Sequence, residues 1–150
     1  MFESFVQKAL AQDKRNCFSP YDGPVDFIPD AFQAFYRDTD PIDVEIRSGA
    51  YGSVRFFPAA ELQQQQEAYE VTPEMFVFAS VNGDPIFLSD GVVYTYAHGC
   101  KGVPWEMLSK DLSSFFQELL YFMLPCVCVV ALFPNQLIVP YLRLGNRSLT

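Results

Sequence analysis

The chain has few of the side chains that most catalytic and metal sites use. It contains one histidine, His98, and four cysteines, Cys17, Cys100, Cys126 and Cys128, with no C-x-x-C pair. These residues fall short of a tetrahedral zinc site, so we expect no bound metal and thiols kept reduced. The motifs G-x-x-x-x-G-K, G-x-G-x-x-G, G-x-S-x-G and H-E-x-x-H are also missing. The sequence therefore predicts neither a metal nor another cofactor.

Basic residues are scarce as well. The chain has 18 Asp and Glu but only 10 Lys and Arg, a formal net charge of −8. All the acidic residues and eight of the basic ones lie in residues 1–118, which carry −10, whereas Arg143 and Arg147 give the remainder +2. An acidic body repels nucleic acid and anionic membranes and attracts basic proteins. The alternative interpretation is that the charge serves solubility alone.

Long uninterrupted apolar runs are missing too. The first ten residues contain Glu3 and no apolar core, so we expect no signal peptide and a cytoplasmic protein. The charge-free stretch 119–142 has its densest part at 119–133, shorter than the ~20 residues of a membrane span, and it contains Pro125. Three alternatives stay open for the tail: strands packed on the domain, a membrane anchor through 119–142, or a loose extension.

What is present in quantity is apolar and aromatic: half of the 150 residues are hydrophobic and 16% are aromatic, enough for one domain with a core. Apolar residues recur at helical spacing over 2–10, 29–39 and 111–123. Pro29 and Pro58 suit the first turns of helices, the second over 58–69, and Asp111 suits an N-cap. The four glutamines 63–66 are interpreted as the solvent-facing side of the helix over 58–69. Asp40-Pro41 is expected to end the helix over 29–39.

Alternating apolar residues predict strands over 43–46 and 53–57, joined by a turn at Gly49 and Gly52. The stretch FVFASVNGDPIFLSDGVVYTYAHG, residues 76–99, has Asn82-Gly83 and Asp90-Gly91 between runs of strand formers, which predicts a three-stranded antiparallel meander. Helices and strands do not alternate strictly. The sequence therefore predicts an α+β fold with a central, largely antiparallel sheet flanked by helices.

The same stretch holds the candidates for chemistry. His98 with Asp84 or Asp90 could act as a general acid–base pair, with Cys100 as a nucleophile. The spacing enforces no convergent geometry and identifies no partner to orient the imidazole. We therefore interpret His98 as a structural residue at a strand end, and the aspartates as turn residues.

A second cluster of acidic residues lies at 38–45. It comprises Asp38, Asp40, Asp43 and Glu45, the densest candidate for a cation site. The cluster lacks the glycine and the terminal glutamate of a calcium loop, so we predict a solvated acidic edge.

Several of these pieces together resemble the SUKH superfamily, which includes a fungal regulator of cell-wall synthesis and many bacterial immunity proteins. The pieces are IPDAFQAFY, the helix over 58–69, FVFASVNGDPIFL, VVYTYAHG and DLSSFFQELL, spanning residues 25–121. The resemblance implies an α+β domain over 1–121 without enzymatic activity. It also implies structural roles for the residues that match its shared positions: Pro29, Gly83, Pro85, Gly91 and Gly99. Asn82 and His98 are interpreted as structural from their places in a turn and at a strand end. Residues 122–150 depart from the family pattern as an apolar extension, which we expect to pack on the same domain.

The resemblance and the acidic charge predict a protein-binding module, most simply an immunity protein that neutralises a basic toxin domain of the nuclease or deaminase class. The alternatives are a regulatory or scaffold protein, and a small hydrolase using His98. Aromatic residues ringed by acids are typical of binding hot spots. The residues predicted to bind the partner are Asp84, Asp90, Tyr94, Tyr96 and Trp105, with core positions as the alternative for Tyr94 and Tyr96.

Overall fold

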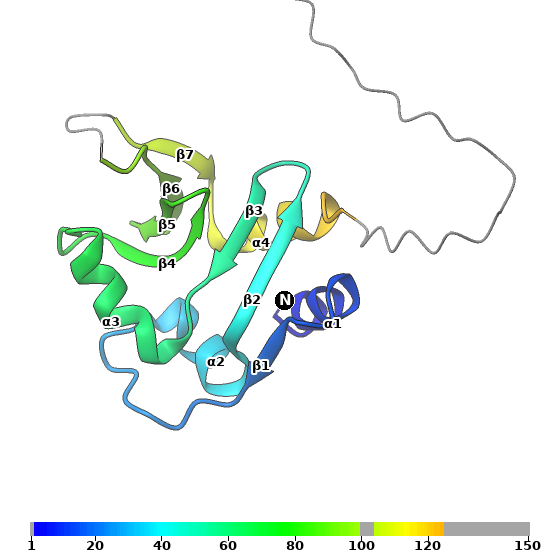
Figure 1. The fold of residues 1–150 in the computed structure, drawn as a ribbon. Coiled ribbons are helices and arrows are strands. Elements are labelled where there is room, and N and C mark those ends of the chain that lie inside the picture. The colour runs from blue at the N-terminus through cyan, green and yellow to red at the C-terminus, as the bar shows by residue number, and fades with distance from the viewer. Residues whose placement is uncertain (1, 100–103, 125–150) are drawn as a thin grey trace, which may run out of the picture.

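The computed structural model describes residues 2–99 and 104–124 (Figure 1). Within them, four helices accompany one seven-stranded antiparallel sheet with the strands in chain order, which confirms the predicted fold class. The helices are α1 (Phe2–Gln12), α2 (Asp30–Thr39), α3 (Ala59–Ala68) and α4 (Leu112–Tyr121). The strands are β1 (Cys17–Ser19), β2 (Asp40–Ser48), β3 (Gly52–Phe56), β4 (Phe76–Val81), β5 (Asp84–Ser89), β6 (Val92–Thr95) and β7 (Glu106–Ser109).

The helices begin where the sequence predicts. Pro29 and Pro58 occupy the cap positions immediately before α2 and α3. Asp111 caps α4, because its carboxylate accepts the N–H of Ser114 at 2.6 Å. Each of the helices α1, α2 and α4 presents an apolar stripe to the sheet.

The centre of the core is a cluster of phenylalanine rings. Phe5 of α1 lies 4.9 Å from Phe116 of α4 and 5.1 Å from Phe56 of β3, measured between ring centroids. Phe35 of α2 lies 5.8 Å from Phe116. All of these rings are at most 1% exposed, so α1, α2 and α4 bury one face of the sheet around β3.

The predicted meander is confirmed as β4, β5 and β6. Asn82 and Gly83 have φ of 53° and 90°, and Asp90 and Gly91 have φ of 48° and 80°. Positive φ at both central residues is the requirement of the two-residue turns that join twisted antiparallel strands. The register of the second hairpin is thereby fixed, with Ser89 opposite Val92.

The sequence predictions miss two strands and place the start of a third too late. The strands β1 and β7 have three and four residues and no clear alternation. The Asp40-Pro41 pair ends α2 as predicted, because α2 ends at Thr39, but the same pair already begins β2, three residues before the predicted strand start at 43.

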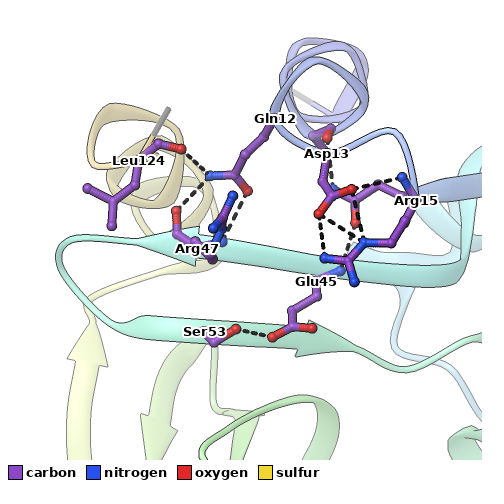
Figure 2. A network of polar contacts seen from close by, with 9 residues as sticks. Gln12, Asp13, Arg15, Glu45, Arg47, Ser53 and Leu124 are labelled. Atoms are coloured by element: carbon purple, nitrogen blue, oxygen red, sulfur yellow. Dashed lines mark hydrogen bonds and ion pairs between the residues drawn. The ribbon is translucent and has the colours of Figure 1, made fainter. Parts of the chain in front are cut away.

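Side chains and a short segment cover the outer edge of β2 beyond β1. Asn16 accepts the N–H of Glu45 at 2.9 Å, and Gln12 pairs with the backbone of Arg47 (Figure 2). The segment after α4 covers the next part of this edge, because the N–H of Leu124 donates to the carbonyl of Arg47 at 3.0 Å. Such coverage leaves few free groups on an edge that another chain could extend. The apolar tail 125–150 with Cys126 and Cys128, and also Cys100, lies outside the described residues.

Candidate functional site

The face of β5–β7 that is not buried against α1, α2 and α4 carries a group of large side chains. We call it the aromatic face and define it by Phe87, Tyr94, Tyr96, Trp105 and Met107. In the sheet register Phe87 pairs with Tyr94, and Tyr94 pairs with Met107. Directly paired residues project to the same side of a sheet, so three adjacent strands contribute to one surface.

The indole of Trp105 packs against two other aromatic rings of this face. Its indole lies 4.9 Å from the Phe87 ring at an interplanar angle of 79°, and 5.5 Å from the Tyr94 ring. Phe87 is fully buried and stacks on Tyr94 at 5.8 Å. Edge-to-face and offset contacts of this kind are favourable for aromatic rings. Trp105 is nevertheless 41% exposed and Met107 is 62% exposed. A rigid aromatic base thus presents two apolar side chains to solvent.

The other end of the aromatic face meets the chain just after α3. The Tyr96 hydroxyl donates to the carbonyl of Tyr69 at 3.0 Å, and the Tyr69 hydroxyl donates to the carbonyl of Gly83 at 3.1 Å. Burial raises the pKa of the Tyr96 phenol, and the nearby negative charges of Glu70 and Asp84 raise it further. Tyr96 is therefore a neutral hydrogen-bond donor beside two carboxylates.

The predicted partner-binding residues do not all lie together. Tyr94, Tyr96 and Trp105 surround Phe87, and Asp84 holds the backbone N–H of His98, two residues after Tyr96. Asp90 is at the opposite end of β5, six residues away, which corresponds to roughly 20 Å along a strand.

Three contributors were not predicted: Phe87, Met107 and Tyr69. The two-residue turn at 90–91 sets Phe87 opposite Tyr94, so counting back from that turn could have found Phe87. Met107 belongs to a strand without an alternating pattern, and Tyr69 reaches the site only through the position of α3.

His98 lies at the rim of this site. Its backbone N–H donates to Oδ1 of Asp84 at 2.7 Å, and its exposed ring lies 5.0 Å from that of Tyr69 in an edge contact. Because Asp84 holds the backbone, this bond does not orient the imidazole for proton transfer. Over the described parts of the chain, no three His, Cys, Asp or Glu side chains gather as a metal site would require.

The acidic cluster 38–45 does not form the predicted solvated edge as a whole. Asp38, Asp43 and Glu45 are exposed, but Asp40 is only 1% exposed. Its carboxylate accepts the N–H of Ala59 at 2.7 Å and so fixes the start of α3. Burial raises the pKa of Asp40, against the lowering effect of this hydrogen bond. The prediction was wrong for Asp40 because the side chain serves a helix end elsewhere in the fold.

Comparisons with protein-family models, curated proteins and solved structures find no significant match to this chain. The likeness to the SUKH superfamily therefore stays a prediction from the sequence motifs. None of the described helices has the length and apolar character needed to cross a membrane.

Proposed function

We propose that this protein is a non-enzymatic, cytoplasmic binding module of the immunity type, which binds a basic toxin domain through the aromatic face and neutralises it. The observation that carries the proposal is the exposed Trp105 in edge-to-face contact with the buried Phe87. Tryptophan and tyrosine in well-packed surroundings are the residues most enriched among binding hot spots. Burial of the exposed side chains of Trp105 and Met107 against a partner supplies the affinity of such a contact.

The charge of the molecule favours a basic partner. Residues 1–118 carry −10, and Glu70 and Asp84 lie at the Tyr96 end of the aromatic face. Nuclease domains bind an anionic substrate and therefore have positively charged clefts. An acidic protein is attracted to such a cleft at long range, and apolar contacts then hold the complex.

The geometry favours binding over catalysis at this site. The aromatic rings offer apolar area, whereas the one histidine at the rim is tied through its backbone to Asp84. Tyr96 and Tyr69 use their hydroxyls on backbone carbonyls, which stiffens the surface. A pre-formed surface loses less conformational entropy on binding than a mobile one.

The test is co-expression with the product of any adjacent gene that encodes a toxin domain. Wild-type protein is expected to restore growth of the host, and His98→Ala is expected to restore it equally, because the imidazole has no catalytic part. Trp105→Ala with Met107→Ala is expected to abolish protection while the protein remains folded. Failure of the wild type to protect, together with no binding to the purified toxin domain, would contradict the proposal.

A further inference from the structure

A groove of about 250 Å³ lies between α1 and α2, away from the aromatic face. Its lining residues are Phe2, Glu3, Val6, Gln7, Ala34, Asp38 and Thr39, and the surface they offer is mostly carbon. Small-molecule sites usually have volumes of roughly 300–1,000 Å³, so this groove suits a single side chain better than a cofactor.

The floor of the groove is fixed by the core. The ring of Phe2 lies 4.8 Å from that of Phe35 and 5.2 Å from that of Phe116. Val6 is 8% exposed and belongs to the main hydrophobic cluster. The hydroxyl of Thr39 donates to the carbonyl of Phe35 at 2.9 Å, so that polar group is already satisfied. The floor therefore has a fixed shape and is largely apolar.

The charges of the lining have one sign. Glu3 and Asp38 are both exposed, one from each helix, and no ion pair of either is found among the described residues. The neighbouring cation on α2, Arg37, donates instead to the carbonyl of Gly23 at 2.9 Å and is not part of the lining. An apolar floor beneath two carboxylates is complementary to an aliphatic stem that ends in a cation.

We propose that the groove receives a lysine or arginine side chain of the partner protein, as an anchor separate from the aromatic face. The aliphatic stem lies on Phe2 and Val6, and the cation lies between the carboxylates of Glu3 and Asp38. Long basic side chains commonly bury the stem and keep the charged end near water in this way. The choice of a protein partner rests on the proposed function, whereas the chemistry of the groove does not.

The experiment is an NMR titration of ¹⁵N-labelled protein with capped lysine, N-acetyl-lysine methylamide. Saturable shifts are expected for the amides of residues 2–7 and 34–39. Capped norleucine has almost the same stem without the charge and is expected to bind at least about fivefold more weakly, as is capped glutamate. Equal binding of lysine and norleucine, or shifts spread over the whole surface, would overturn the proposal.

Variants place the effect in the groove. Glu3→Gln with Asp38→Asn is expected to weaken the binding of capped lysine at least about fivefold. Glu67→Gln with Glu74→Gln removes two exposed carboxylates elsewhere and is expected to have less than about a twofold effect. Ala34→Leu fills the groove from an exposed helix position and is expected to abolish the shifts with an unchanged melting temperature. Shifts that persist in Ala34→Leu would overturn the assignment.

The two proposals fail separately. Binding of capped lysine to the groove without protection against the toxin contradicts the immunity function and leaves the groove assigned. If Ala34→Leu protects the host and binds the toxin domain as well as the wild type does, the groove is not part of the interface. The immunity function is then supported by the aromatic face alone.

Discussion

The side-chain amide of Gln12 pairs with the backbone of Arg47 in the way that a neighbouring strand would. Nε2 of Gln12 donates to the carbonyl of Arg47 at 2.7 Å, and Oε1 accepts the N–H of Arg47 at 3.0 Å. The same Nε2 also donates to the carbonyl of Leu124 at 2.7 Å. As Figure 2 shows, one carboxamide from the end of α1 thus joins β2 to the segment that follows α4.

Replacing this amide tests its structural role. Gln12→Met keeps the approximate length and removes all three hydrogen bonds, which leaves partly buried backbone groups without a partner. We expect the free energy of unfolding to fall by about 2–3 kcal/mol, measured by urea denaturation. Gln7→Met, an exposed position on the same helix, is the control and is expected to change stability by less than about 0.5 kcal/mol. Equal stabilities of the two variants would contradict this role.

A second glutamine pairs in the same way with the backbone of β4. Gln66 of α3 donates to the carbonyl of Val77 and accepts the N–H of Val77, each at 2.7 Å. Gln66→Met is therefore expected to lower the free energy of unfolding by about 1–3 kcal/mol. Gln64→Met, two residues away and exposed, is expected to have an effect below about 0.5 kcal/mol. A similar loss in both variants would show that helix propensity, and not the contact with Val77, sets the stability.

These glutamines show where prediction from sequence ends. The helices, the meander and its two turns follow from local patterns, because periodicity and Asn-Gly or Asp-Gly turns act over a few residues. The Gln12–Arg47 contact spans 35 positions, and nothing at either position signals it. The run 63–66 was interpreted as solvent-facing, which holds for Gln63 and Gln64 but not for Gln66.

The candidate site divides in the same way. Tyr94, Tyr96 and Trp105 were predicted from their residue types and lie together around Phe87. Asp90 lies just beyond the far end of β5, a separation that follows from the strand length and not from the residue types. Met107 belongs to the site because it lies in β7, a strand without alternating apolar residues. Tyr69 belongs to it because of where α3 ends in the fold.

Asp40 provides a test of pH dependence. Burial raises the pKa of Asp40 above 3.8, the usual value for an aspartate. Just above pH 3.8, the folded state therefore holds the carboxyl proton of Asp40 more tightly than the unfolded state does. The contribution of protonated Asp40 to the free energy of unfolding is fully present below pH 3.8. This contribution is lost as the pH rises through the raised pKa. Asp40→Asn keeps an acceptor for the N–H of Ala59 and abolishes this loss.

We therefore expect the free energy of unfolding of the wild type, relative to Asp40→Asn, to fall between pH 3.5 and pH 7. Urea denaturation of both proteins across this range measures the difference. Asp43→Asn, exposed on the same strand, shows the effect of removing net charge alone. A difference that stays constant or increases with pH would contradict the buried position of Asp40.

The acidic charge predicts how the partner is approached. The rate of association with a basic toxin domain is expected to fall at least about tenfold between roughly 0.02 M and 0.5 M salt, because screening shortens the range of the attraction. The dissociation rate is expected to change far less, since apolar contacts hold the complex. Stopped-flow fluorescence of Trp105, the single tryptophan of the chain, measures both rates. An association rate that does not change with salt would show that the acidic charge does not contribute to partner recognition.

The central claim is that Trp105 on its base of Phe87 and Tyr94 anchors the partner. Its most direct test is the affinity of wild-type protein and of Trp105→Ala for the toxin domain, measured by isothermal titration calorimetry. Phe27→Ala, which truncates a comparably exposed aromatic residue outside the aromatic face, is the matched control. The account predicts at least about a thirtyfold loss of affinity for Trp105→Ala and less than about a threefold change for Phe27→Ala. Wild-type affinity in a folded Trp105→Ala protein would contradict it.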